Sequence, residues 1–298
     1  MVHKIAYAKF DLAIHIKPKK TADGYFPVHY IDCQIDLCDK LTFENQIEKI
    51  EVICDEPTLP VDEDNFVYKT AILLKKIVDN KQSFSSNKRL GAKITLLKGI
   101  PIKAGFGGGS SDAAATLLGL CRLWQIRLDD NQIKSLTREL GKDFYYSLHG
   151  RLSEVVGKGK NYQVTALSSR LPELWLLIVV PLSEKPSTSW VYEHLDTKNI
   201  GRNFDKIEKL KMAILKNDKM GILKNLTNDF EDSVLPNFPI VGKMKDDLAQ
   251  VGAQASIMAG SGLAVVGFFD SLKKAEEGKN KLKSRRGLKQ IFVARPIN

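Results

Sequence analysis

A glycine-rich stretch between an expected strand and an expected helix constrains this chain more than any other feature. The strand is expected at residues 92–98 (AKITLLK), and the helix follows residue 112 with apolar side chains at helical spacing. Residues 105–109 read GFGGG and are followed by Ser110, Ser111 and Asp112, which are typical helix caps. Glycine adopts positive φ easily and lets a ligand approach the main chain closely. The stretch therefore predicts a turn that is open to a ligand.

A glycine turn that leads into a helix predicts an anion site. It presents backbone N–H groups together with the positive end of the helix dipole, and phosphate is the commonest occupant of such sites. Two other phosphate motifs do not fit, because no lysine follows the glycines and no G-x-G-x-x-G can be read. A strand–helix turn without a ligand stays the alternative, although each glycine costs a helix or strand about 1 kcal/mol.

Composition and charge exclude several classes of protein. The net charge of +10 suits a polyanionic ligand, but much of the excess lies in residues 206–224 and 273–289, which are expected to be solvated helix faces. Nucleic acid is therefore not the favoured partner. The four cysteines lack C-x-x-C spacing and are expected to be reduced thiols. Without a signal-peptide pattern or a long apolar run, we expect a cytoplasmic protein that does not enter the membrane.

The pattern of the chain indicates a β-rich first hundred residues and a mixed second half. Residues 5–16 alternate as a strand that places Lys9 and Asp11 on one face. Residues 29–36 and 40–43 are expected to be strands separated by a turn at Asp39. Residues 174–181 (LWLLIVVP) predict a strand buried on both faces. Helices are expected at residues 66–77, 129–140, 203–226 and 241–250, a polar loop at 81–89, turns at 21–25, 155–160 and 228–231, and a glycine turn feeding a strand at 255–269.

The glycine stretch resembles the second motif of the GHMP kinases, small-molecule kinases named for galactose, homoserine, mevalonate and phosphomevalonate. The likeness lies in Pro101-x-x-x-Gly105-Phe-Gly-Gly-Gly-Ser-Ser-Asp. Met258-Ala-Gly-Ser-Gly262 is similar to the third motif of the family, and the resemblance covers nearly the whole chain. It implies an α+β, two-domain fold, with a ribosomal-S5-like ATP-binding domain at residues 1–165 and an α/β-sandwich domain at residues 166–298.

The resemblance also implies the residues that handle ATP and carry the chemistry. Tyr7-Ala-Lys-Phe-Asp resembles a family segment whose lysine is catalytic, here Lys9, and Gly141-Lys-Asp-Phe resembles one whose aspartate is the base, here Asp143. An adjacent ammonium would keep that carboxylate ionised to accept a hydroxyl proton. Mg²⁺ is implied as cofactor, with Ser111 as a weak candidate contact. The residues expected at ATP are Pro101, Gly105, Gly107, Gly108, Gly109, Ser110 and Ser111.

Within the family, the closer resemblance is to the members that phosphorylate the 2-hydroxyl of 4-diphosphocytidyl-2-C-methyl-D-erythritol in isoprenoid biosynthesis. Ala22-Asp-Gly-Tyr25 is similar to the segment whose aromatic ring stacks on cytosine. The implied partner is therefore a small molecule carrying cytidine diphosphate, bound by a monomer or homodimer. The residues expected at this substrate are Asp11, Tyr25, Phe26, Thr188, Tyr192, Gly260 and Ser261.

Departures from the family pattern keep two alternatives open. Asp11 stands for an asparagine, Phe26 for a histidine, Tyr145 for a proline and Ala259 for a hydroxyl residue. One alternative is a GHMP kinase for homoserine or a mevalonate-type alcohol. The other is a non-catalytic nucleotide- or RNA-binding homologue, which would bind with a steep dependence on salt and transfer no phosphate.

Overall fold

The chain folds into two compact units that are each discontinuous in sequence. The computed structural model describes residues 1–79, 90–159 and 161–297, so the loop predicted at 81–89 lies outside the described residues. One unit, which we call the helix unit, contains residues 1–8, 37–100 and 107–149. The other, the motif unit, contains residues 9–36, 101–106 and 150–298. Strands β1 (Val2–Ile16) and β2 (Val28–Gln46) and the glycine stretch each run from one unit into the other.

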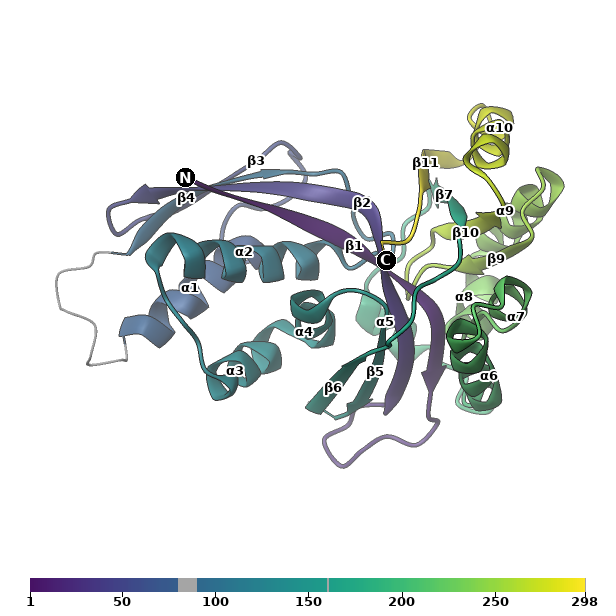
Figure 1. Ribbon diagram of the computed structural model, residues 1–298, viewed down its shortest axis with the longest axis horizontal. Coiled ribbons are helices and arrows are strands. Elements are labelled where there is room, and N and C mark those ends of the chain that lie inside the picture. The colour runs from purple at the N-terminus through teal and green to yellow at the C-terminus, as the bar shows by residue number, and fades with distance from the viewer. Residues whose placement is uncertain (80–89, 160, 298) are drawn as a thin grey trace. The chain divides into compact units, whose positions relative to one another are not determined.

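The helix unit combines a four-stranded part of the first sheet, which includes the first half of β1, with four helices among its described residues. β3 (Ile50–Cys54) runs parallel to β4 (Gly91–Leu97), and β4 pairs antiparallel with the second half of β2. Helix α2 packs against α1 and α4, as Figure 1 shows. Apolar side chains from the strands and from α1, α2 and α3 share one core. The helices are α1 (Phe66–Asp79), α2 (Gly108–Trp124), α3 (Asp130–Leu140) and α4 (Lys142–His149).

The helix boundaries in this unit follow from local chemistry. Asn65 precedes α1, and its side-chain oxygen accepts the N–H of Val67 at 2.8 Å. Asp129 and Gln132 form a reciprocal capping box at the start of α3. Gly141 ends α3 with φ 92°, a conformation that favours glycine. The predictions of these two helices are confirmed.

The motif unit holds the remaining strands of the first sheet and a separate antiparallel sheet. The hairpin β5 (Ser153–Lys158) and β6 (Asn161–Ala166) pairs with the first half of β2, and β8 (Thr227–Asn228) pairs with β1. The second sheet has the order β11-β7-β10-β9. These strands are β7 (Trp175–Pro181), β9 (Ala255–Met258), β10 (Val265–Phe269) and β11 (Leu288–Ala294).

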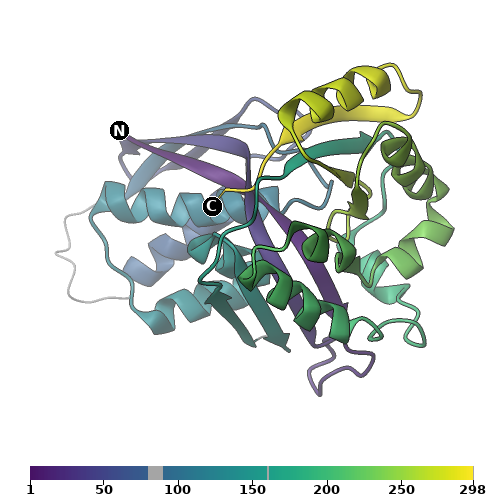
Figure 2. The ribbon, with the colours of Figure 1, turned by 45° about the vertical axis from the view of Figure 1, so that its right-hand side comes forward.

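Helices of the motif unit cover and connect these strands. α9 (Pro239–Gln250) and α10 (Leu272–Leu282) pack against the second sheet, and Figure 2 shows them beside it. The continuous apolar run in β7 is buried, as predicted, because the strand pairs on both edges and contacts both helices. The other helices are α5 (Thr188–Glu193), α6 (Phe204–Leu215), α7 (Lys219–Lys224) and α8 (Glu231–Asn237).

Three local predictions were wrong. Asp39 makes no turn: it is fully buried inside the continuous strand β2, where Lys98 and two backbone N–H groups satisfy its carboxylate. Residues 229–230 form a turn as predicted, but the segment is not helix-poor, because Glu231 begins α8. Helix α2 starts at Gly108, ahead of the predicted caps, and its N-cap is Gly107 in the left-handed conformation.

Two general expectations can be compared with the described residues. All four cysteines are free thiols, as predicted. Across residues 1–79, 90–159 and 161–297, we find no helix with the length and apolar character needed to cross a membrane.

Candidate functional site

The predicted site residues are divided between the two units. Lys9, Asp11 and the third glycine motif belong to the motif unit, whereas Gly107–Ser111 and Asp143 belong to the helix unit. The glycine stretch itself passes between the units at Phe106 and Gly107. The pairing of Lys9 with Asp143 and the boundary at residue 165 therefore stay predictions.

In the motif unit, Lys9 and Asp11 form a buried ion pair. They lie two residues apart on β1, so their side chains share a face, as the alternation predicted. Lys9 Nζ lies 2.5 Å from Asp11 Oδ1, and the two residues are 4% and 1% exposed. The ammonium also lies 5.8 Å from the ring centroid of Tyr30. The negative charge that Asp11 adds is therefore balanced by the lysine predicted to be catalytic.

The two glycine motifs pack backbone against backbone in this unit. A Cβ atom at Gly105 would overlap the carbonyl oxygen of Ala259, and one at Gly262 would overlap that of Ala104. Gly105 also has φ 103°. The main-chain N–H of Lys9 donates to the carbonyl of Phe106 at 3.0 Å, which ties β1 to the same loop. These glycines are thus required by close main-chain contact.

Side chains near the start of α8 hold the third glycine motif in place. Asn228 Nδ2 donates to the carbonyls of Met258 at 2.9 Å and Gly260 at 2.8 Å. Glu231 accepts the N–H of Met258 at 2.7 Å and pairs with Lys245 at 2.6 Å. We predicted no role for Asn228 or Glu231, which lie in the segment Asn228-Asp-Phe-Glu231. Both are positioning residues for the loop.

The predicted substrate residues of the motif unit fall into an aromatic group and a hydroxyl group. Phe26 stacks on Tyr192 with ring centroids 6.4 Å apart, and the Tyr192 hydroxyl lies 3.1 Å from that of Tyr30. The Tyr25 side chain is largely solvent-accessible, with the residue 46% exposed. Thr188 and Ser261 instead contact the ammonium of Lys185, at 3.2 Å and 3.5 Å. Lys185 was missed by the sequence reasoning.

In the helix unit, the start of α2 has backbone donors that the helix itself does not use. The first hydrogen bond of the helix runs from Ser111 N to Gly107 O at 2.9 Å, and no side chain caps this end. The N–H groups of residues 108–110 precede that bond and have no acceptor within the helix. Ser111 Oγ donates to the Tyr7 carbonyl at 2.7 Å, which anchors the first turn to β1. This geometry fits the phosphate groups of a nucleotide.

Two of the glycines in this turn are closely packed against side chains. A Cβ at Gly108 would lie 3.1 Å from Ile100, and one at Gly109 would lie 3.2 Å from the Phe66 ring. Both distances are tighter than ordinary van der Waals contact. Glycine therefore lets the turn sit directly on the side chains beneath it.

A buried charge cluster lies beneath this first turn. Lys98 Nζ contacts both Asp39 and Asp112, with 2.7 Å to Asp112 Oδ2. Burial lowers the pKa of Lys98, but the two carboxylates outweigh it and raise that pKa overall. Burial raises the pKa of Asp112 to about 8, opposed by Lys98 and reinforced by Asp39. Asp39 accepts from Lys98 and two main-chain N–H groups, whereas Asp112 Oδ1 has no hydrogen-bond partner among the described residues. Asp112 is therefore the carboxyl group that takes up a proton.

Asp143, the predicted base, lies in the first turn of α4. Its side chain is 30% exposed, and Oδ1 lies 2.5 Å from Lys142 Nζ. The carboxylate is thus accessible from solvent and has an ammonium beside it in its own unit. Both properties suit a group that must receive a proton from a bound alcohol.

A second charged cluster in the motif unit has the composition of a metal site but does not need a metal. His29, Glu154 and Glu208 offer ligand atoms within 4.8 Å of one another. Lys211 Nζ, however, lies 2.8 Å from Glu154 and 3.7 Å from Glu208. Burial raises the pKa of Glu154, but hydrogen bonds from Lys211 and His29 lower it overall. The ammonium supplies the positive charge that a metal ion would otherwise bring.

Comparison with known proteins gives consistent matches along the whole chain. The GHMP kinases N terminal domain matches residues 65–151, and the GHMP kinases C terminal domain matches residues 210–287. The chain is 34% identical, over 98% of each chain, to the 4-diphosphocytidyl-2-C-methyl-D-erythritol kinase of Enterococcus faecalis strain V583. It is 33% identical to the enzyme of the same name from Synechococcus sp. strain JA-3-3Ab, over 93% of this chain and 88% of that one.

Solved structures agree with these matches. A crystal structure of 4-(cytidine 5′-diphospho)-2C-methyl-D-erythritol kinase superposes with a TM-score of 0.79 at 25% identity, covering 99% of both chains. L. major mevalonate kinase superposes with a TM-score of 0.73 at 15% identity, over 99% of this chain and 96% of that one. The second likeness concerns the fold alone. The predicted fold class is confirmed.

Proposed function

The chain belongs to the GHMP kinase family, and we propose that it uses ATP to phosphorylate the 2-hydroxyl of 4-diphosphocytidyl-2-C-methyl-D-erythritol, a step of non-mevalonate isoprenoid biosynthesis. The observation that carries the proposal is the full-length likeness to relatives named for this substrate. Mevalonate kinase shares the fold at 15% identity, so the fold by itself does not select the alcohol.

Lys9 and Asp143 are the proposed catalytic residues. Phosphoryl transfer depends on in-line positioning and on neutralising the charge of the transferred group. Lys9 supplies a buried positive charge whose position is fixed by Asp11 and by the hydrogen bond of its backbone to Phe106. Asp143 receives the proton of the substrate hydroxyl. Its partial exposure and neighbouring ammonium support this role.

The first turn of α2 and the glycines before it are proposed to hold the ATP phosphates. The N–H groups of residues 108–110 supply donors, and Pro101, Gly105 and Gly107 shape the approach. Mg²⁺ would neutralise phosphate charge when bound. Ser111 stays its proposed contact in the protein, because donating its hydrogen to Tyr7 leaves lone pairs on the hydroxyl oxygen.

The proposed substrate end is built from the aromatic and hydroxyl groups of the motif unit. The largely exposed Tyr25 has an aromatic face to stack on a base, whereas Phe26 is already stacked on Tyr192. Phe26 lacks the hydrogen-bonding nitrogen of a histidine, so base recognition here depends more on stacking. Thr188, Gly260 and Ser261 are proposed to border the rest of the substrate.

A coupled assay for ADP release tests the proposal directly. ATP and Mg²⁺ would be supplied with 4-diphosphocytidyl-2-C-methyl-D-erythritol, homoserine or mevalonate in parallel reactions. We expect turnover with the cytidyl substrate alone. Turnover with homoserine or mevalonate instead would favour the alternative that Asp11 and Phe26 keep open, and binding of ATP without any turnover would indicate a non-catalytic homologue.

The role of Asp143 has its own test. Asp143→Ala should lower kcat by at least two orders of magnitude, since general bases contribute about 10²–10⁴-fold. Asp130→Ala is the matched control, because Asp130 also lies in the first turn of a helix of the same unit and is exposed. A turnover number within a few-fold of wild type for Asp143→Ala would contradict the assignment.

A further inference from the structure

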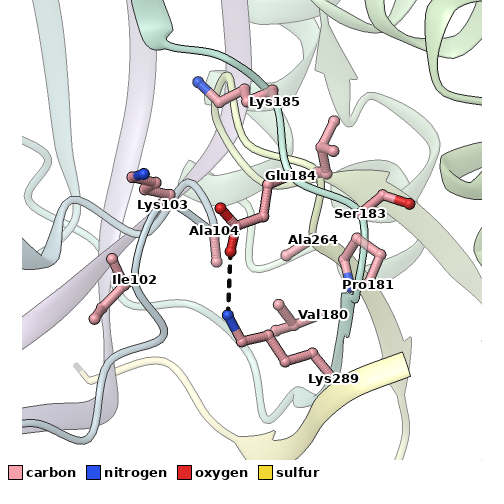
Figure 3. A pocket seen from close by; sticks show the side chains of 11 residues that line it. Ile102, Lys103, Ala104, Val180, Pro181, Ser183, Glu184, Lys185, Ala264 and Lys289 are labelled. Atoms are coloured by element: carbon pink, nitrogen blue, oxygen red, sulfur yellow. Dashed lines mark hydrogen bonds and ion pairs between the residues drawn. The ribbon is translucent and has the colours of Figure 1, made fainter. Parts of the chain in front are cut away.

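A small pocket of the motif unit is lined by an unusual number of lysines. It lies among residues 102–104, the end of β7 with residues 183–185, and residues 263–264, and Lys289 of β11 closes it (Figure 3). Three lysines, Lys103, Lys185 and Lys289, line this pocket together with a carboxylate from Glu184. Glu184 Oε1 lies 3.3 Å from Lys289 Nζ, so the carboxylate is paired with that lysine.

Lys185 differs from its neighbours because it is buried without a carboxylate. The residue is 8% exposed, and its ammonium donates to the hydroxyls of Thr188 at 3.2 Å and Ser261 at 3.5 Å. Both partners are neutral, and no ion pair to Lys185 is found among the described residues. In Figure 3 its side chain points away from the Glu184–Lys289 pair. Burial lowers the pKa of Lys185 to about 8. An uncompensated buried cation destabilises a fold, and a bound anion would compensate it.

Contacts within the motif unit connect this ammonium to the predicted catalytic lysine. Ser261, which Lys185 contacts, follows Gly260 in the third glycine motif. A Cβ at Gly260 would lie 3.2 Å from Asp11 Oδ2, and Asp11 is paired with Lys9. Lys185 and Lys9 are therefore both linked to one short loop, and of these two lysines only Lys9 has a carboxylate partner among the described residues.

We propose that Lys185 binds a phosphate group of a nucleotide ligand and is a phosphate-binding residue of the site. The inference rests on the proposed function, which supplies two phosphate-bearing ligands, ATP and the cytidine-diphosphate substrate. Its ammonium has three N–H donors, of which the two hydroxyls take at most two. A phosphate oxygen would take the remaining donor and supply the missing negative charge. Thr188 and Ser261 then orient the ammonium.

Calorimetry without turnover, with ADP and CDP measured separately, tests whether Lys185 binds phosphate. It also shows which of the two nucleotides supplies that phosphate. The variant is Lys185→Met, and the matched control is Lys289→Met, since Lys289 lines the same pocket but is neutralised by Glu184. We expect Lys185→Met to weaken one of the two nucleotides by about tenfold or more. Weaker binding of ADP would show that Lys185 contacts the phosphates of ATP. Weaker binding of CDP would show that it contacts the diphosphate of the substrate. Lys289→Met should leave both affinities within about twofold.

Two further measurements keep the proposal separate from the proposed function and from a structural role. Lys185→Arg should recover most of the lost affinity, because it keeps the charge, whereas Lys185→Gln should not. Unchanged binding of both nucleotides by Lys185→Met would overturn the proposal even if the enzyme turns over. Normal nucleotide binding by the wild type without phosphorylation of any alcohol would overturn the proposed function and leave the role of Lys185 standing. A wild type that binds neither nucleotide would overturn both.

Discussion

Two buried lysines, one in each unit, show opposite ways of placing a positive charge inside a protein. Lys98, beneath the first turn of α2, contacts two carboxylates, and its pKa is raised overall because they outweigh burial. Lys185, beside the third glycine motif, contacts two neutral hydroxyls, and burial lowers its pKa to about 8. The first charge is satisfied within the fold. The second is left for a ligand, so these two lysines differ in the number of carboxylates that surround them.

The largest expected effect on stability comes from replacing Lys98, the lysine that is paired with carboxylates within the fold. Lys98→Met leaves Asp39 and Asp112 buried without their shared cation, and breaking a buried ion pair in this way costs about 3–5 kcal/mol. The free energy of unfolding, measured with urea at pH 7, should fall by that amount. An effect below about 1 kcal/mol would show that the rest of the cluster satisfies the two carboxyl groups without Lys98.

The pH dependence of stability should reveal the carboxyl group in the same cluster. The folded-state pKa of Asp112 is about 8, above its ordinary value of 3.8, so the folded protein holds a proton that the unfolded chain has released. Stability from this group is complete below pH 4 and is lost as pH rises through 8. Asp112→Asn should remove this slope, on the order of 4 kcal/mol between pH 5 and pH 8. Parallel urea titrations of both proteins would measure the difference.

The unsatisfied lysine should give a smaller effect of opposite sign. Lys185→Met removes a buried charge and should raise the stability of the ligand-free protein at pH 7 by about 1 kcal/mol. The folded-state pKa of about 8 lies below the ordinary 10.5, so the penalty for burying the charge is relieved as pH rises from 8 to 10.5. The difference in stability between Lys185→Met and the wild type should therefore become smaller over that pH range. Thermal unfolding at pH 7 and pH 10 measures it, and a destabilised variant would mean that the hydroxyls satisfy Lys185.

The smallest change in stability is expected from replacing an exposed lysine. Lys209 pairs with Asp205 at 2.9 Å, but both side chains are more than half exposed. Lys209→Met should change the free energy of unfolding by at most about 0.5 kcal/mol, because solvent screens such pairs. A loss comparable to that of Lys98→Met would show that burial and carboxylate number do not explain the difference between the two regions.

Local signals in the sequence were enough for much of the fold. Helices α1 and α3 begin directly after Asn65 and Asp129, and α3 ends at Gly141, close to the predicted bounds. Capping depends on neighbours along the chain, so it can be predicted from the sequence. The apolar run of β7 predicted its burial for the same reason. Within the site, the alternation of β1 predicted that Lys9 and Asp11 share a face, and the structure shows them as an ion pair.

Contacts between distant parts of the chain could not be predicted. Aspartate favours turns, so Asp39 was expected to interrupt the strand, but Lys98 lies 59 positions later and satisfies it there. The burial of Lys185 depends on Thr188 and on Ser261, the latter 76 positions away. Neither of these contacts in space can be derived from the order of residues. The features that the sequence did not predict are therefore charged groups whose hydrogen-bond partners come from distant parts of the chain.

The packing of Gly105 on Ala259 and of Gly262 on Ala104 has a consequence for engineering new specificities. Although far apart in the sequence, the two loops form one interlocked part, in which the main chain of each fills the space beside the other. A loop transplanted alone from another kinase would have to match the main-chain path of its partner atom for atom. Recombination should therefore exchange the two loops as a pair, and libraries that vary one of them should hold these glycines constant.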